Sequence, residues 1–73
     1  MVAGDALSVT GRCVEMSRST YRVACDFAGQ ERVVLAKLSG RLNHHHIRVV
    51  VGDEVTVEVS PYDLTRGRIT RRL

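Results

Sequence analysis

Aromatic side chains are scarce in this sequence: two tyrosines, one phenylalanine and no tryptophan make up 4% of its 73 residues. A core must therefore be built from Val, Leu, Ile and Ala. The hydrophobic content of 44% is enough for one small domain and too high for a disordered chain. So few aromatics also leave no pair of rings on which unpaired bases could stack, and recognition of single-stranded bases is not expected.

Long apolar runs and targeting signals are also missing. No segment approaches the roughly 20 apolar residues that cross a bilayer, and the start, Met1–Val9, lacks the basic region and apolar stretch of a signal peptide. We therefore expect a cytoplasmic protein with no membrane partner. Cys13 and Cys25, the only cysteines, are expected to be free, half-buried thiols, because disulfides are rare in that compartment.

Motifs of catalysis and cofactor binding are absent as well. The sequence shows no nucleophile beside a base, no glycine-rich phosphate loop and no pair of carboxylates in an apolar context. Asp53 and Glu54 are adjacent, but they fall in a predicted turn, where carboxylates are common. We therefore expect neither an enzyme nor a bound cofactor.

Three adjacent histidines, His44 to His46, are the only histidines of the chain. Neighbours on an extended segment point to opposite faces, so at most His44 and His46 could share a metal ion. A closed zinc site needs four ligands, and Cys13 and Cys25 belong to other elements. The sequence therefore favours a surface loop over a metal site.

The pattern that is present has a period of two. Apolar and polar residues alternate in Leu7–Cys13, Tyr21–Phe27 and Val55–Val59, and shorter strands are expected at 33–35 and 68–72. Turns are expected at 17–19, 28–31 and 52–53, and Pro61 ends the fourth strand. Gly11 indicates a bulge or a bend between two halves of a sheet. The positions expected to face inward include Val9, Val23, Val55, Val57 and Ile69.

Residues 38–46 break this rhythm and predict a single helical turn, with Ser39 as its N-cap. Five short strands, with one helical turn between the third and the fourth, predict an all-β fold. We expect a five-stranded Greek-key barrel of the OB type, as a single domain over residues 1–73. An SH3-like barrel is the structural alternative.

The charge of the chain favours a polyanionic partner, with a membrane surface as the second choice. The net charge is +3, and the isoelectric point is about 9.4. Arg66, Arg68, Arg71 and Arg72 fall near the end without an acid among them, and Arg41 and Arg48 flank the histidines. Arginine forks match phosphate oxygens in pairs, which suits a folded RNA backbone. A solvated charged surface is the alternative.

Several short motifs resemble the bacterial translation initiation factor 1 family. They are Gly11, Tyr21–Val23, Ser39–Arg41, Ile47–Arg48, Gly52–Asp53, Val55–Glu58 and the run Pro61–Ile69. The resemblance spans nearly the whole chain, and the run Pro-Tyr-Asp-Leu-x-x-Gly-Arg-Ile is its most specific part.

The resemblance implies a translation factor with an S1-like RNA-binding OB domain. Such factors bind the small ribosomal subunit at the A site of the decoding region, contact the ribosomal RNA there and act with the other initiation factors. Arg41, Arg48, Arg68 and Arg72 match basic positions of the family. Residues expected to contact RNA are Arg41, Asn43, His44, His46, Arg48, Arg66, Arg68, Arg71 and Arg72. Tyr62 and Asp63 match a turn that we expect to orient the last strand rather than to touch RNA.

Two features depart from the family pattern. Asn43, His44 and His46 occupy positions where relatives usually place basic residues or a tyrosine, and the turn at 26–30 is longer than usual. Three alternatives remain open: a divergent second copy of the factor, a generic RNA-binding or RNA-chaperone domain, and a protein-interaction module that uses an open barrel edge. The last would bind without sensitivity to salt. We expect a monomer that does not bind DNA.

Overall fold

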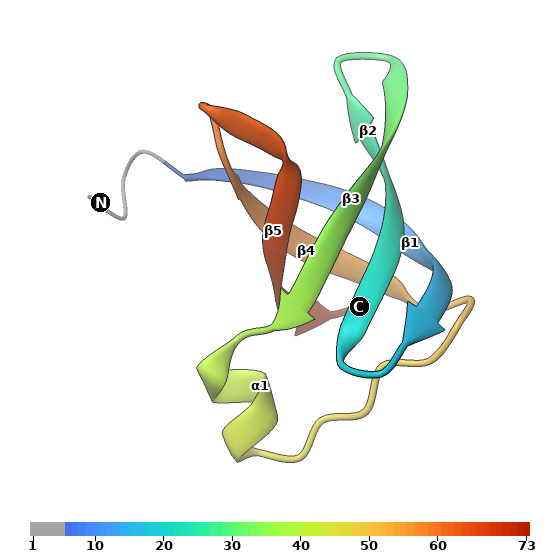
Figure 1. The fold of residues 1–73 in the computed structure, drawn as a ribbon, viewed down its shortest axis with the longest axis vertical. Coiled ribbons are helices and arrows are strands. Elements are labelled where there is room, and N and C mark those ends of the chain that lie inside the picture. Colours follow the sequence, from blue (N-terminus) through green and yellow to red (C-terminus); the bar gives the residue numbers. More distant parts are fainter. Residues whose placement is uncertain (1–5) are drawn as a thin grey trace.

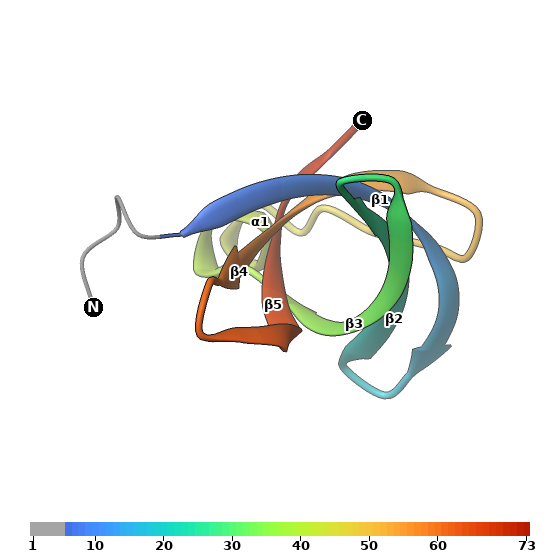
Figure 2. The ribbon, with the colours of Figure 1, turned by 90° about the horizontal axis from the view of Figure 1, so that it is seen from above.

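The computed structural model describes residues 6–73 (Figure 1), so Met1–Asp5, the first part of the segment compared with signal peptides, lies outside the described residues. The elements are β1 (Leu7–Ser17), β2 (Thr20–Phe27), β3 (Gln30–Leu38), α1 (Gly40–His44), β4 (Glu54–Ser60) and β5 (Asp63–Arg72). The strands close into a barrel in the order β1-β2-β3-β5-β4, which Figure 2 shows from above. The predicted five-stranded barrel with one helical turn is confirmed. No helix within residues 6–73 has the length and apolar content needed to cross a membrane.

The barrel is filled by the inward side of the period-two pattern. Val23, Val55, Val57 and Ile69 are fully buried, as predicted, whereas Val9 is only partly buried against them. The remaining core residues are Cys13, Tyr21, Cys25, Val34, Ala36, Leu42, Val49 and Val59. Small aliphatic side chains therefore form most of the core, as the shortage of aromatics predicts.

Gly11 lies where β1 passes from one neighbour to the other. Residues Leu7–Arg12 pair with β4, and residues Gly11–Ser17 pair with β2. A Cβ atom on Gly11 would lie 2.6 Å from the carbonyl oxygen of Ala24, so the close approach requires glycine. The expected bend is therefore found, but the bulge itself lies between Cys13 and Glu15, beyond the glycine.

Four predicted strand boundaries are wrong by three residues or more. β1 ends at Ser17 rather than at 13, β3 ends at Leu38 rather than at 35, and both β3 and β5 start early. The turn between β2 and β3 is only Ala28–Gly29, both with positive φ (54° and 85°), as in tight two-residue hairpins. Asp26 stabilises it by accepting a hydrogen bond from the Gly29 N–H (2.9 Å). β3 therefore starts at Gln30 rather than at 33, and the residues that were expected to lengthen the turn instead extend a hairpin (Figure 1).

β5 also begins earlier than predicted, at Asp63 rather than at 68. Its pairing with β4 shifts between Val59 and Ser60, so the start of the strand does not follow simple alternation. The carboxylate of Asp63 accepts hydrogen bonds from the hydroxyl and the N–H of Thr65, which lower the pKa of Asp63. The turn formed by Pro61 and Tyr62 thus leads directly into β5.

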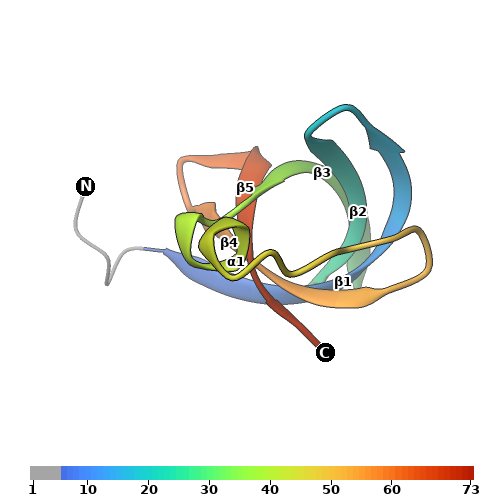
Figure 3. The ribbon, with the colours of Figure 1, turned by 90° about the horizontal axis from the view of Figure 1, so that it is seen from below.

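Helix α1 is the predicted helical turn. Ser39 caps it by accepting a hydrogen bond from the N–H of Leu42 (3.3 Å), and the buried side chain of Leu42 anchors it. His44 is the last residue of α1 and His45 is its C-cap, so these histidines end a helix rather than sit in an extended loop. Figure 3, the view from below, shows α1 at the lower end of the barrel.

Cys13 and Cys25 are free thiols, as predicted, but they are fully buried rather than half-buried. Burial raises the pKa of Cys25 to about 11 and also raises the pKa of Cys13. Both sulfurs are therefore neutral and weakly nucleophilic at physiological pH, because the thiolate is the reactive form.

Candidate nucleic-acid interface

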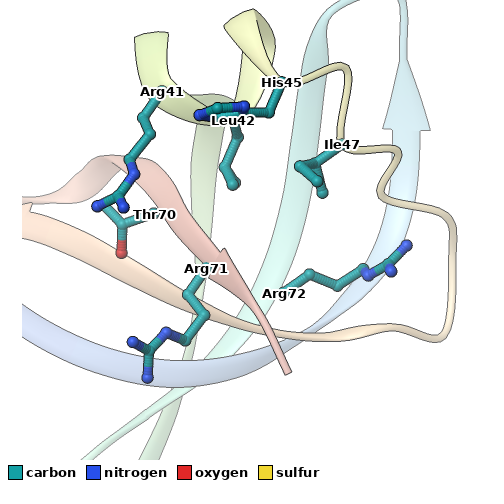
Figure 4. Close-up of a pocket in the computed structure, with 7 residues that line it drawn as sticks. All are labelled: Arg41, Leu42, His45, Ile47, Thr70, Arg71 and Arg72. Atoms are coloured by element: carbon teal, nitrogen blue, oxygen red, sulfur yellow. The ribbon is translucent and has the colours of Figure 1, made fainter.

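A cationic groove of about 350 Å³ lies between α1 and the end of β5. Figure 4 shows Arg41 extending from α1, while Arg71 and Arg72 extend from the last strand. Leu42, His45, Ile47 and Thr70 complete the lining, which contains no acidic residue. The groove thus combines an apolar floor with a rim of guanidinium groups.

A local irregularity of β5 places two of these arginines. Ile69 pairs with Val57, whereas Arg71 pairs with Thr56, so Thr70 is an extra residue in the ladder. The hydroxyl of Thr70 donates a hydrogen bond to the carbonyl oxygen of Thr56 (3.4 Å). Such a bulge changes the direction of the following side chains. In Figure 4 the Arg72 side chain extends towards the loop that follows α1, and Arg71 extends away from α1 along the other side of the strand.

Arg72 also ties β5 to the segment that follows α1. Its Nη1 donates a hydrogen bond to the main-chain carbonyl oxygen of Arg48 (2.9 Å). The Leu73 N–H donates to the carbonyl oxygen of Glu54 (2.8 Å), which fixes the strand end against β4. Arg48 is therefore held beside the groove by its main chain, and its side chain is exposed.

The charges of the groove are not neutralised by neighbours. Within the described part of the chain, residues 6–73, the one ion pair joins Arg22 to Glu15 (3.1 Å) on β2 and β1. Arg41, Arg71 and Arg72 therefore produce a concentrated positive potential, which attracts polyanions and is screened by salt.

A second cationic region lies on the barrel wall over β3 and β5. In the parallel pairing of these strands, Lys37 lies opposite Arg68, and Leu35 lies opposite Arg66. Lys37, Arg66 and Arg68 line a shallow hollow of about 520 Å³, together with Glu58 from β4. The predicted arginines are thus divided between the groove and this wall.

The other predicted residues lie around α1. Asn43 lines a smaller hollow of about 190 Å³ with Tyr21 and Lys37. His44 and His46 are exposed, and the His44 ring contacts the His45 ring edge to face, with centroids 5.3 Å apart. Among residues 6–73, no group of three His, Cys, Asp or Glu side chains is placed to hold a metal ion.

Lys37 and His45 were missed by the sequence prediction. Lys37 is the only lysine and stands alone in its part of the sequence, so its proximity to Arg68 depends on the parallel pairing of β3 with β5. His45 was passed over because strand-like alternation selects His44 and His46. The cap signal at Ser39 could have found it, since a helical turn brings residues four apart, such as Arg41 and His45, to one side.

Together, the barrel, the helical turn at its end and the unpaired arginines define a class: this is a small OB-fold protein with a cationic end. Over 69 residues the chain is 52% identical to "Translation initiation factor IF-1" of Solibacter usitatus (strain Ellin6076), covering 93% of this chain and 92% of that relative. The chain belongs to the translation initiation factor IF-1 family.

Solved structures agree with this assignment. The solution structure of the translation initiation factor of this family from the Wolbachia endosymbiont strain TRS of Brugia malayi has a TM-score of 0.76 and 33% identity, over 94% of this chain and 79% of that one. The chain is therefore a translation initiation factor, takes part in protein biosynthesis and is not an enzyme. No family model matches the chain.

Parts of two larger proteins share the barrel. YloQ, a circularly permuted GTPase, has a TM-score of 0.78 at 15% identity, and this chain covers 25% of it. YjeQ from Thermotoga maritima has a TM-score of 0.69 at 25% identity, with 92% of this chain matched to 23% of that one. Because the matched part is about a quarter of each, these similarities concern the fold alone.

Proposed function

We propose that this chain binds the small ribosomal subunit at the A site of the decoding region and acts there with the other initiation factors. In this proposal it works in the cytoplasm as a monomer, and residues 1–73 are a single RNA-binding domain whose main ligand is ribosomal RNA. The observation that carries the proposal is the acid-free groove in which Arg41, Arg71 and Arg72 come together. Membership of a translation initiation factor family supports the ribosome as the source of that RNA.

Contact with phosphates follows from the chemistry of the groove. A guanidinium group donates two parallel hydrogen bonds to a phosphate, and each neutralised phosphate releases bound counterions. Arg41, Arg71 and Arg72 would bind one stretch of RNA backbone, and Arg48 would extend the contact along the loop. Arg66 and Arg68 would reach a neighbouring strand from the wall.

Asn43, His44 and His46 would contribute differently from the arginines. An amide or an imidazole makes hydrogen bonds but lacks the fork of donors that a guanidinium offers to a phosphate. These three exposed side chains around the end of α1 would therefore adjust the fit to RNA more than the overall affinity.

The aromatic residues support readout of RNA shape rather than of bases. Tyr21 is buried in the core and Phe27 is partly buried, whereas Tyr62 is 88% exposed. A single exposed ring does not form the multi-ring platform on which modules for single strands stack their bases. Binding to a folded RNA backbone is the mode that this surface fits.

Salt dependence of binding to purified small subunits tests the proposal. Affinity measured by co-sedimentation should fall steeply between about 50 and about 200 mM salt, because phosphate contacts release counterions. Addition of the other initiation factors should increase the amount bound, and excess oligouridine should compete poorly. A salt-independent affinity, or equal competition by oligouridine, would contradict the assignment.

A pair of double variants locates the contact. Arg48→Ala with Arg68→Ala should weaken binding by on the order of 1–3 kcal/mol for each lost charge-assisted contact. Arg12→Ala with Arg32→Ala removes the same charge from exposed positions on β1 and β3 and serves as the matched control. Equal losses in both pairs would show that only net charge matters.

A further inference from the structure

The barrel leaves part of one strand edge open. β3 pairs with β5 only through Leu35–Leu38, while most of its length pairs with β2 on the other side. Within the described residues, Gln30–Val34 therefore have a strand neighbour on one side only. Figure 1 shows that this part of β3 belongs to the hairpin that projects from the barrel. An unpaired strand edge is a template for another strand.

Apolar side chains accompany this edge on the outer face. Val33 is 52% exposed and Leu35 is 41% exposed, although both belong to a regular strand of the barrel. Ala24 of β2 lies directly opposite Val33 and continues the apolar stripe across the sheet. This apolar stripe, Ala24, Val33 and Leu35, would lose contact with water if a further strand were added.

Positive charges surround one end of the stripe. Leu35 lies between Arg22 of β2 and Arg66 of β5 in the strand register, and Lys37 follows it on β3. Thr20, Leu35, Lys37 and Arg66 line a shallow hollow of about 470 Å³ at this end. Arg22 is partly neutralised by Glu15, whereas Lys37 and Arg66 have no ion pair within residues 6–73.

We propose that the open edge of β3 docks an extended segment of another protein by strand addition. The main chain of that segment pairs with Gln30–Val34, and its alternate apolar side chains cover Val33 and Leu35. An acidic side chain on the same face, next after the apolar ones, lies near Lys37 and Arg66. This mode of recognition takes affinity from main-chain hydrogen bonds and specificity from alternate side chains.

Two other occupants fit the same edge less well. A second copy paired through a twofold axis centred on Glu31 or Arg32 would place like charges opposite each other, and like charges in that position repel. An axis centred on Val33 would leave only three residues to pair, because Leu35 already pairs with β5. Single-stranded RNA gains most from aromatic rings, and the apolar stripe offers only aliphatic side chains. An acidic and apolar peptide is therefore the ligand that matches the surface.

The open edge and the cationic groove can be occupied together. The groove is lined by residues of α1, the following loop and the end of β5, and it shares no residue with the apolar stripe. Arg66 of the cationic wall is assigned to both ligands, so the two sites meet at that residue. The hairpin tip and α1 lie at opposite ends of the molecule in Figure 1. The proposed docking thus goes beyond RNA binding and would join a protein segment to the ribosome-bound factor.

Titration of the isotopically labelled full chain with a synthetic peptide tests this proposal by NMR. The probe is a peptide of about seven residues that carries two valines and then a glutamate at alternate positions on one face, with threonine on the other face. We expect the amide signals of β3 to shift and alternate amides of Gln30–Val34 to exchange more slowly. Val33→Ser with Leu35→Ser should weaken binding about tenfold, because two apolar contacts are lost. Val50→Ser with Val51→Ser, two exposed valines outside the stripe, should leave binding unchanged.

Three results would overturn the proposal. A peptide N-methylated on its edge-facing amides that binds equally well would exclude main-chain pairing. Hexauridine that shifts the same β3 amides at lower concentration than the peptide would identify the edge as an RNA site. Concentration-dependent shifts of these amides without peptide would assign the edge to a second copy. RNA binding is measured separately with small subunits, so either proposal can fail alone.

Discussion

The two ends of the barrel carry different surfaces, although the same five strands build both. The α1 end gathers Arg41, Arg71 and Arg72 around an acid-free groove. At the opposite end the β2–β3 hairpin carries Asp26 and Glu31 in register with each other, and beside them the exposed Val33. A rigid OB barrel therefore separates a polyanion-binding chemistry from a strand-pairing chemistry, and each end can be altered without the other.

Removal of charge at the α1 end should have the largest effect. Arg41→Ala with Arg71→Ala leaves the Arg72–Arg48 hydrogen bond intact and should weaken small-subunit binding by about 2–6 kcal/mol. Co-sedimentation measures the loss, and circular dichroism checks that the barrel persists. Arg12→Ala with Arg32→Ala is the control, and a loss of the same size there would show that net charge rather than the groove sets the affinity.

The second prediction concerns the core that both ends share. Cys25 has a pKa of about 11, raised by burial from 9.0. The neutral thiol therefore stabilises the fold fully below about pH 9, and this contribution is lost as the pH rises through about 11. The loss amounts to about 3 kcal/mol at most. The free energy of unfolding of the wild type, measured with denaturant, should fall over this pH range. That of Cys25→Ala should fall less steeply. Identical pH profiles would refute the assignment.

Neither thiol should be needed for function at neutral pH. Mass spectrometry of the native protein should show both cysteines reduced, and reduction should not unfold it. A native disulfide between Cys13 and Cys25 would contradict the buried thiols.

Gly67, where β5 lies close against β4, gives the third prediction. A Cβ atom on Gly67 would lie 2.7 Å from the carbonyl oxygen of Glu58 and 2.7 Å from Cγ1 of Val57. Gly67→Ala should therefore destabilise the barrel by about 1–3 kcal/mol in denaturant unfolding. Gly40→Ala, where the added atom meets nothing within 4 Å, should be neutral or slightly stabilising. Equal stability of the two variants would show that β4 and β5 move apart enough to accommodate the added methyl group.

The smallest effect is expected at the histidines. Replacement of His44, His45 and His46 by glutamine should weaken small-subunit binding by less than about 1 kcal/mol for each ring, as expected for exposed polar groups. Co-sedimentation measures the loss, and Arg41→Ala with Arg71→Ala is the comparison. A loss as large as that of the arginine pair would place the histidines at the centre of the contact.

The sequence predicted what depends on local pattern. Alternation located the inward positions such as Val57, and Ser39 marked the start of α1, because side-chain period and capping are set by neighbouring residues. The groove depends on the bulge at Thr70, and the wall depends on the parallel pairing of Lys37 with Arg68. Both depend on the register in which one strand pairs with another, and no local pattern in the sequence reveals that register.

The tight hairpin shows the same limit on a shorter scale. Polar residues around Ala28 indicate a turn but not its length, because Ala28 must adopt the left-handed conformation that alanine rarely takes. Gln30–Arg32 therefore lengthen β3 rather than the turn. They belong to the open edge of β3, and the sequence indicated binding at a barrel edge only as one alternative.

The short seam between β3 and β5 also has a consequence for folding kinetics. It is the one parallel pairing among the described strands and joins Leu35–Leu38 to Arg66–Ile69. Hairpins form early because their loops are short, whereas this seam and the β1–β4 pairing must each close a longer loop before any of their hydrogen bonds can form. The seam has four residue pairs and the β1–β4 pairing has six, so we expect the seam to open first in hydrogen exchange. The barrel would then open between β3 and β5, while the β1–β4 pairing holds the β1–β2–β3 meander and the β4–β5 hairpin in one sheet.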